Sequence, residues 1–191
     1  MAKIRKRLMR AGNMLNPTPV VMVSCGSTID EYNILTIAWT GTTSSDPPGC
    51  YISVRPNRHS YEIIKRNGCF VINLVNKRLA PAADWCGVVS GKKYNKFFET
   101  GLTPIKASKV SAPMIEEAPV NIECKVTQIV PLGTHDMFLA EVVAVHANEN
   151  LFSKQTDSLA LQKANLVTYS HGHYYALGEI IGKFGFSVEK K

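Results

Sequence analysis

The sequence predicts a mainly β protein whose strands form a closed antiparallel sheet with short helical insertions. Roughly six or seven segments rich in β-branched and aromatic residues are bounded by Gly and Pro, as strands are. Their spacing is irregular and the helical patterns do not alternate with them, which argues against a parallel βαβ fold. With 191 residues, of which 45% are apolar and 19% charged, the chain is expected to form one domain, 1–191, with its own core.

The first half of the chain supplies a series of predicted strands and one predicted helix. The strands are Val20–Ser24, Ile34–Thr40, Cys50–Val54 and Cys69–Val75. The helix spans 57–66, because Asn57 can cap its start and Asn67-Gly68 ends it. Hydroxyl-rich residues from Thr40 to Ser45 lead into a Pro-Pro-Gly turn, and a solvated turn is one interpretation of this stretch.

The second half begins with two short predicted helices. The first spans 78–86, with Pro81 in its first turn, and the second spans 92–100 and ends at Gly101. A loop with two prolines, 108–119, separates them from two long strands, Val120–Val130 and Met137–His146, which form a hairpin. A short helix at 157–164 and a strand at 166–169 complete the series before His171-Gly-His173.

The net charge of +7 lies largely at the two ends of the chain. Residues 1–14 are expected to form a mobile basic tail. A basic surface attracts nucleic acid, but no zinc finger, RNP-like motif or recognition helix accompanies the charge. A basic entrance for an anionic nucleotide cofactor therefore fits better, and nucleic acid is not the expected partner.

The sequence also indicates the cellular compartment of the protein. No run approaches the roughly 18 apolar residues of a membrane span, and the basic N-terminus lacks the apolar region of a signal peptide. The cysteines number five, with no Cys-x-x-Cys pair, which favours reduced thiols. His171 and His173 lack further ligands nearby, so no metal site is expected. These features predict a cytoplasmic protein without a membrane segment.

The stretch from Asn33 to Ser60 has the composition of a site for a small phosphorylated aromatic ligand. An extended strand can lie along a planar ring, and hydroxyl groups can donate to phosphate oxygens. Arg55 and Arg58 stand at the start of the predicted helix, whose N-terminus favours an anion.

The same residues resemble the flavin reductase-like, FMN-binding split-barrel proteins, and above all their flavoredoxin branch. The resemblance runs from Asn16-Pro-Thr-Pro to about Gly178. It is carried by Asn33–Trp39, Ser45-Asp-Pro-Pro, Phe70-Val-Ile-Asn-Leu, Asp84-Trp-Cys-Gly-Val-Val-Ser-Gly-Lys and Asn95-Lys-Phe-Phe. It implies a split β-barrel, a homodimer and bound FMN, with FAD less expected. Some candidate cofactor-binding residues are implied by the resemblance, and others are suggested by their own chemistry. Together they are Asn33, Thr36, Ile37, Ala38, Trp39, Thr40, Thr43, Ser45, Arg55, Arg58, Ser60 and Lys96.

Several of these residues have a structural alternative. Trp39 can belong to the core or pack near the ring, and Arg55 can bind phosphate or pair with a carboxylate. Lys96 can place positive charge near the flavin or lie on a solvated helix face. Cys86 is expected to be buried and inert, because no partner cysteine is adjacent. His171 is a candidate flavin neighbour or catalytic residue by resemblance.

The expected function is electron transfer through bound FMN. One version is a reductase that takes hydride from NADH or NADPH, and the other is a flavoredoxin-type carrier that exchanges electrons with a redox partner protein. The alternative is a non-enzymatic ligand-binding or nucleic-acid-binding β-barrel, which only the basic charge supports.

Overall fold

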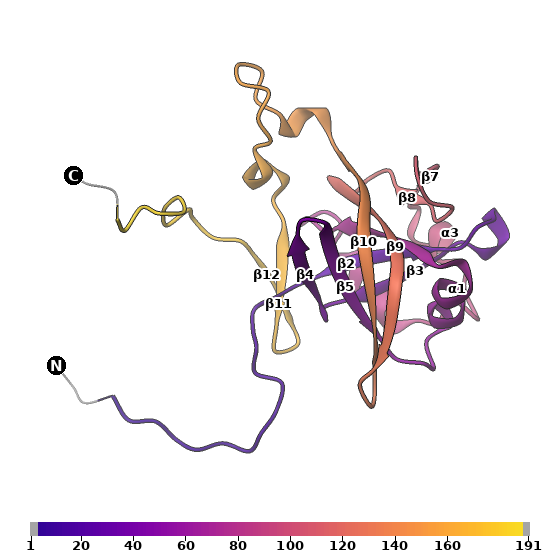
Figure 1. Ribbon diagram of the computed structural model, residues 1–191, viewed down its shortest axis with the longest axis horizontal. Coiled ribbons are helices and arrows are strands. Elements are labelled where there is room, and N and C mark those ends of the chain that lie inside the picture. The colour runs from indigo at the N-terminus through magenta and orange to yellow at the C-terminus, as the bar shows by residue number, and fades with distance from the viewer. Residues whose placement is uncertain (1–3, 189–191) are drawn as a thin grey trace.

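The structure, a computed structural model, describes residues 4–188 and confirms the mainly β, antiparallel architecture (Figure 1). The body is a seven-stranded antiparallel sheet with the order β3-β2-β6-β9-β10-β5-β4. Its strands are β2 (Val21–Cys25), β3 (Asn33–Ile37), β4 (Thr40–Ser45), β5 (Pro48–Val54), β6 (Cys69–Leu74), β9 (Val120–Pro131) and β10 (Asp136–Ala147). The edge strands β3 and β4 are separated in sequence only by Ala38 and Trp39, so the sheet curls round until its edges meet.

Smaller elements surround this barrel. The sheet β1-β11-β12 joins β1 (Thr18–Pro19), β11 (Val167–Ser170) and β12 (His173–Ala176), and a two-stranded ribbon joins β7 (Pro104–Ile105) and β8 (Met114–Ile115). The α-helices are α1 (His59–Asn67), α2 (Ala80–Val88) and α3 (Lys96–Thr100). Short 3-10 turns occur at η1 (Ile29–Glu31), η2 (Glu149–Leu151) and η3 (Leu161–Ala164).

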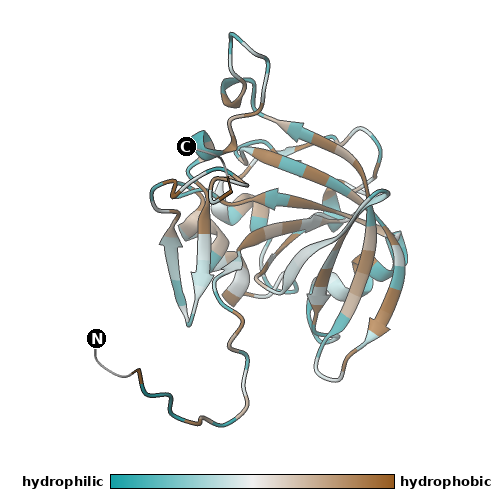
Figure 2. Cartoon of the chain, turned by 60° about the vertical axis from the view of Figure 1, so that its left-hand side comes forward, coloured by the Kyte–Doolittle hydropathy of each residue, from teal (hydrophilic) through white to brown (hydrophobic). Residues whose placement is uncertain are grey.

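The strand β2 is buried on both of its faces. Val21 and Val23 belong to the cluster inside the barrel, together with Phe70 and Phe138. The intervening Met22 belongs to a second cluster, which residues of α2 and α3 share. Because side chains alternate along a strand, one apolar run packs against the barrel interior and against the helices at once. The brown, apolar residues of Figure 2 accordingly follow the central strands.

The predicted strands at Val20–Ser24, Cys50–Val54, Cys69–Val75, Val120–Val130 and Met137–His146 are confirmed, each within a few residues. Pro81 lies in the first turn of α2, as predicted. Gly101 ends α3 with a φ of 66°, where glycine avoids the strain of a side chain.

Other sequence predictions need correction. Residues 40–45 form strand β4 rather than a turn, because they pair with β5 from Thr40–Ile52 to Ser45–Pro48. Asn57 does not cap α1, since the N-cap is Arg58, without a side-chain hydrogen bond. The helices predicted at 92–100 and 157–164 shorten to α3 and the 3-10 turn η3.

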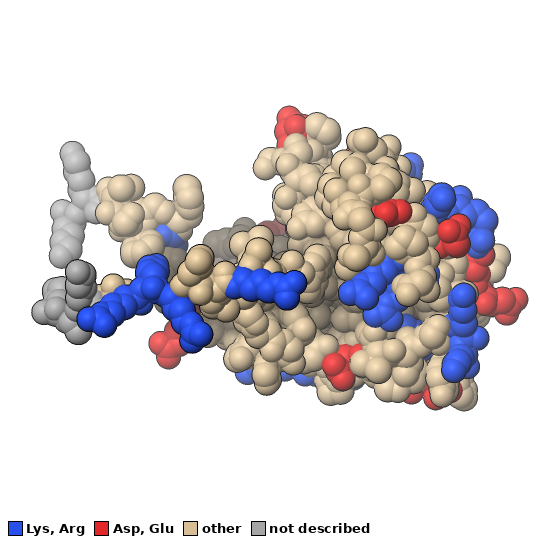
Figure 3. All heavy atoms as spheres, turned by 90° about the horizontal axis from the view of Figure 1, so that it is seen from below, with Lys and Arg blue, Asp and Glu red and all other residues tan. Residues whose placement is uncertain are grey.

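Two exposed arms leave the sheet formed by β1, β11 and β12. The N-terminal arm, residues 4–16, precedes β1 and has no regular secondary structure, and the C-terminal arm, residues 177–188, follows β12. Both extend to the same side of the molecule in Figure 1. Figure 3 shows blue Lys and Arg side chains along the N-terminal arm, whereas blue and red are interspersed on the visible face of the body.

Within residues 4–188, no helix combines the length and the apolar content that crossing a bilayer requires.

Candidate functional site

Two neighbouring cavities lie where the edges of the barrel sheet meet. The smaller, here called the polar cavity, holds about 190 Å³, and the larger, here called the large cavity, holds about 710 Å³. Leu35, Arg55 and Arg58 line both, so the two cavities adjoin. The polar cavity is lined by Asn33, Leu35, Arg55, Asn57, Arg58, His59, Ser60, Val89, Ser90, Gly91 and Lys96.

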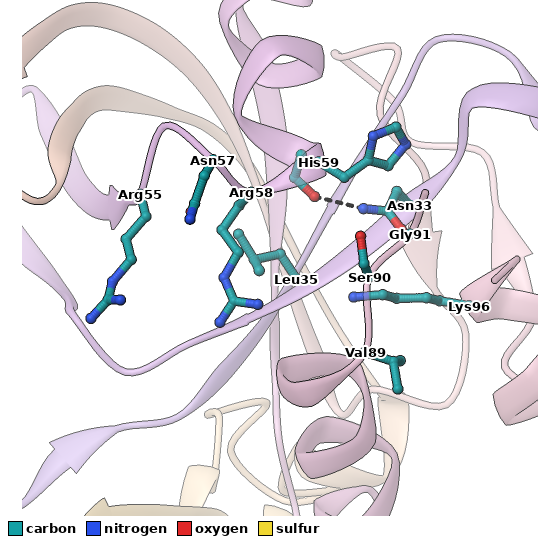
Figure 4. Close-up of a pocket in the computed structure, with 11 residues that line it drawn as sticks. Asn33, Leu35, Arg55, Asn57, Arg58, His59, Val89, Ser90, Gly91 and Lys96 are labelled. Atoms are coloured by element: carbon teal, nitrogen blue, oxygen red, sulfur yellow. Dashed lines mark hydrogen bonds between the residues drawn. The ribbon is translucent and has the colours of Figure 1, made fainter. Parts of the chain in front are cut away.

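Arg55 and Arg58 bring two guanidinium groups to the wall that the cavities share. Both lie in the short segment between β5 and α1, and Figure 4 shows both side chains among the residues that line the polar cavity. Across residues 4–188, neither forms an ion pair with a carboxylate; Arg55 Nε instead donates to His135 Nε2 at 3.3 Å. The arginines are therefore available to an anion, and the carboxylate alternative for Arg55 does not hold.

Lys96 adds a buried positive charge to the polar cavity. It is 2% exposed, and its Nζ donates to the carbonyls of Ile34 at 2.8 Å and Cys86 at 2.6 Å. Burial lowers the pKa of Lys96 to about 8, and the charge of Arg58 acts in the same direction. The side chain is therefore still largely protonated at neutral pH. The alternative of a solvated helix face for Lys96 is wrong.

Asn33, Ser60 and Gly91 close the polar cavity. Asn33 Nδ2 donates to Ser60 Oγ at 2.7 Å, which joins the start of β3 to the first turn of α1. A Cβ on Gly91 would lie only 2.2 Å from Asn33 Oδ1, so the loop after α2 reaches Asn33 only because this residue is glycine. The result is a small, donor-rich compartment.

The two histidines near the arginines carry little charge at neutral pH. The pKa of His59 is lowered by burial and then by Lys92 and Lys96. The pKa of His135 is lowered by burial and then by Arg55 and Arg58. Neutral His135 can accept from Arg55 through Nε2. Neither histidine was predicted from the sequence. His135 comes next to Arg55 only through the fold, whereas His59 lies directly between the predicted residues Arg58 and Ser60.

The large cavity lies between β3 and α2, with further walls from the hairpin of β9 and β10 and from β11 and β12. It is lined by Asn13, Val20, Leu35, Thr36, Ile37, Ala38, Trp39, Ser53, Val54, Arg55, Arg58, Asp84, Gly87, Val88, Leu132, Thr134, His135, Tyr169, Gly172 and Tyr174. Thr36 Oγ1 donates to the carbonyl of Ala83 at 2.5 Å, and a Cβ on Gly87 would lie 3.3 Å from Thr36 Cβ. Helix α2 is therefore packed closely on β3.

Trp39 lines the large cavity and is 43% exposed, so it is not a core residue. Its large aromatic surface is available to a planar ligand. Trp39 lies just after β3, the strand along which the sequence predicted a planar ring, and its neighbours Ile37 and Ala38 line the same cavity.

The structure gathers most of the sequence-predicted site residues and leaves some outside. Asn33, Arg55, Arg58, Ser60 and Lys96 line the polar cavity, and Thr36, Ile37, Ala38 and Trp39 line the large one. Thr40, Thr43, Ser45 and His171 line neither cavity.

The residues left outside have structural reasons to be there. Thr40 is buried and its Oγ1 donates to the carbonyl of Tyr51 at 2.6 Å. Thr43 and Ser45 are exposed and lie further along β4, because the ladder with β5 carries this strand away from Trp39. His171 occupies an exposed turn with a φ of 47°, and only its neighbour Gly172 reaches the large cavity.

Cys86 is buried, as expected, and burial raises the pKa of its thiol to about 11. The thiol is therefore protonated at neutral pH and unreactive. In the described part of the chain, no three His, Cys, Asp or Glu side chains are placed to hold a metal ion.

Comparisons with known proteins agree with this arrangement. The family model of the flavin reductase like domain matches residues 13–178. A solved structure of flavoredoxin from Desulfovibrio vulgaris (Miyazaki F) is 28% identical, with a TM-score of 0.89 over 97% of this chain and 100% of that one. An FMN-binding protein from Thermus thermophilus shares the fold at 22% identity, with a TM-score of 0.77 over 96% of this chain and 99% of that one.

An uncharacterized protein from Aeropyrum pernix is 33% identical over 110 residues, which span 57% of this chain and 42% of the Aeropyrum protein. The family match covers most of the chain, and it includes both edges of the sheet and all the residues that line the two cavities. The chain belongs to the flavin reductase-like split-barrel family, and within it to the flavoredoxin branch.

Proposed function

We propose that this protein binds FMN and transfers electrons through it, with the phosphate in the polar cavity and the ring system in the large cavity. Family membership supports a flavin cofactor and a flavin-related redox function. The observation that carries the finer proposal is the shared wall: Arg55 and Arg58 line both cavities. A ligand with an anionic end joined to a planar end fits such a pair of compartments.

The donors of the polar cavity fit a phosphate monoester. Arg55, Arg58 and Lys96 supply positive charge, and Ser60 and Ser90 supply hydroxyl groups. The first amide groups of α1 add their dipoles, because Arg58 as N-cap leaves them without a side-chain acceptor. FMN ends in such a phosphate, and this favours FMN over FAD, whose phosphates lie inside a longer molecule.

The large cavity supplies the surroundings of a flat ring. Leu35, Ile37 and Val54 provide apolar walls, and Trp39 provides an aromatic one. Bound flavin would supply the redox chemistry, while these residues orient the ring and keep water from part of its surface. The buried charge of Lys96, held on the carbonyl of Ile34 in β3, favours negative charge at this end of the site.

Two forms of the activity follow from such a site. In one, NADH or NADPH gives hydride to the flavin, and in the other a redox partner protein exchanges electrons with it. Anaerobic stopped-flow mixing with each nicotinamide nucleotide separates them, because a reductase loses its oxidised flavin absorbance and a carrier of the second kind does not.

The experiment that tests the proposal is a visible absorption spectrum of the purified protein. It is repeated after addition of FMN and removal of the unbound excess. A retained flavin spectrum at one FMN per chain is expected. A colourless protein after this treatment overturns the proposal.

We also propose that two copies of the chain associate, and that the protein works in the cytoplasm. The apolar C-terminal arm supports the first point, since it exposes Leu177, Ile180, Ile181, Phe184 and Val188. The five free cysteines support the second. Four of the basic residues that suggested nucleic acid, Arg5, Lys6, Arg7 and Arg10, are exposed on the N-terminal arm, which has no regular secondary structure.

A further inference from the structure

Part of the wall of the large cavity has a chemistry of its own. Asp84, Tyr169 and Tyr174 line it, and they come from α2, β11 and β12. On α2, Asp84 is five residues before Val89, which lines the polar cavity. A helix rises about 1.5 Å per residue, so roughly 7–8 Å along the axis separate Asp84 from the polar cavity.

The two tyrosines and Asp84 form one connected group. Tyr174 Oη donates to Asp84 Oδ1 at 3.0 Å, and the rings of Tyr169 and Tyr174 meet edge to face with centroids 5.8 Å apart. Burial and then the hydrogen bond to Asp84 raise the pKa of Tyr174 to about 12, so the phenol keeps its proton and holds the carboxylate in place. The aromatic wall and its carboxylate are thus built features of the cavity.

The carboxylate of Asp84 lacks a neutralising partner. Over residues 4–188, no Lys, Arg or His lies within 4.0 Å of it, and Tyr174 is its hydrogen-bonding partner. Residues 84, 87 and 88 follow helical spacing, so the carboxylate shares the cavity-facing side of α2 with Gly87 and Val88. The large cavity is therefore lined by two cationic side chains, Arg55 and Arg58, and by one carboxylate, Asp84, with which they form no ion pair.

We propose that Asp84, Tyr169 and Tyr174 form a second subsite, which takes a planar reaction partner and selects against negative charge. This inference rests on the proposed function, in which the flavin ring occupies the part of the cavity near the arginines. The tyrosine rings supply a face for a planar molecule, and Asp84 favours a cationic or neutral one over a carboxylate or sulfonate. Reaction partners of this class include neutral quinones, enones and pyridinium rings.

The test uses three planar probes of nearly equal shape: benzamidine, benzamide and benzoate, with charges of about +1, 0 and −1 at neutral pH. Their affinities for the full chain are measured by calorimetry with excess FMN present, and inorganic phosphate is added only to a sample that retains no flavin, so that Arg55 and Arg58 are occupied in either case. We expect benzamidine to bind at least tenfold more tightly than benzoate, with benzamide between them. In the D84N variant, the three affinities should converge to within about threefold, because the amide keeps the shape and removes the charge.

One further variant serves as the control. Glu116→Gln removes one exposed negative charge elsewhere on the surface and should keep the order of the three probes. Equal affinity for benzoate and benzamidine, or a preference that survives in D84N, overturns the inference, as does a lack of binding by all three.

The visible spectrum of each sample separates this inference from the function on which it rests. Probe selectivity without retained flavin overturns the FMN proposal and keeps the subsite. Retained flavin without probe selectivity keeps FMN and overturns the subsite.

Discussion

Arg58 stands where the polar cavity and the large cavity meet, and it is also the N-cap of α1. Its backbone precedes the first residue of the helix, and its side chain lines the polar cavity together with that of Arg55 (Figure 4). One residue therefore contributes both a side-chain charge and the position of a helix N-terminus to the proposed phosphate site.

Arg58→Ala is expected to weaken FMN binding on the order of 30-fold, since a hydrogen bond to a charged group contributes about 2 kcal/mol. Riboflavin, which lacks the phosphate, should lose far less affinity. Fluorescence titration with both flavins measures the difference. The control is Arg78→Ala, an exposed arginine outside both cavities. Equal losses for FMN and riboflavin would remove Arg58 from the phosphate site.

Glu123 on β9 is a fully buried charged residue outside the two cavities. Its carboxylate accepts hydrogen bonds from the amides of Ser108, Lys109 and Val110, from Ser108 Oγ, and from His146. Burial alone would raise its pKa. The hydrogen bonds, first those of Ser108 and then those of His146 and Lys109, outweigh burial and lower the pKa from 4.5 to about 2.

A lowered pKa in the folded state means that ionised Glu123 stabilises the fold above pH 4.5, and that this contribution is lost as the pH falls toward 2. The loss amounts to roughly 3 kcal/mol at 1.36 kcal/mol per pKa unit. Glu123→Gln should lower the free energy of unfolding by a similar amount at pH 7 and flatten its dependence between pH 4.5 and 2.

Urea unfolding at several pH values, followed by circular dichroism, measures both effects of Glu123→Gln. Glu99→Gln, an exposed carboxylate on α3, is the matched control and should change neither quantity. If Glu123→Gln leaves the stability and its acid dependence as they are in the original chain, the loop at 108–110 is held in another way.

At the scale of single residues, the sequence identified those site residues that are close together in the chain. Arg55, Arg58 and Ser60 were predicted because one short segment carries them all. His135, Asp84 and Tyr174 were not assigned a role, since their place depends on the hairpin and the second sheet closing over the cavity. No local pattern marks a residue that acquires its partner from 90 positions away.

Among the elements, the loop that follows α2 controls the size of the polar cavity. It passes Asn33 so closely that Gly91 has no room for a methyl group. Gly91→Ala is expected to displace this loop or Asn33, and to weaken FMN binding about tenfold or more. Gly178→Ala, on the C-terminal arm with no atom within 4 Å of an added Cβ, should leave the affinity unchanged.

Fluorescence titration of both glycine variants with FMN makes the comparison, and thermal unfolding shows whether either variant loses its fold. A Gly91→Ala protein that binds FMN as tightly as the original chain would show that this loop can move without lowering the affinity for FMN.

Most strands could be predicted from the sequence because their apolar runs are buried on at least one face. Strand β4 could not. Its six residues, Thr40–Ser45, are mostly hydroxyl-bearing and mostly exposed, and only pairing with β5 makes them a strand. The predicted cap at Asn57 also failed, since α1 begins at His59 with Arg58 as its N-cap.

For the molecule as a whole, the split barrel was predicted from the resemblance to a family, because the periodicity of the sequence does not show how the strands are ordered. Alternating residues identify strands, but they do not order them, and the neighbours β6 and β9 are far apart in the chain. The arms are also a property of this scale. Their apolar side chains, among them Leu8, Leu15, Ile181 and Phe184, are exposed in the single chain.

An uncovered apolar arm is expected to find a surface on a second copy. Replacing Ile180, Ile181 and Phe184 with Ser should convert a dimer into a monomer, because their side chains are 74%, 93% and 107% exposed in one chain. Light scattering coupled to size-exclusion chromatography measures the mass. Glu179→Gln, within the same arm, should remain dimeric. An original chain that is monomeric at all concentrations would contradict the expectation.

The short link between the two edges of the barrel has a dynamic consequence. Residues of β3, of this link and of the segment after β5 together line the large cavity. Any fluctuation that parts the edges therefore also takes the site apart, and a ligand that binds only the closed state suppresses the fluctuation. Amide hydrogen exchange in β3 and β5 should then slow together when the site is filled, while exchange in the C-terminal arm keeps its rate.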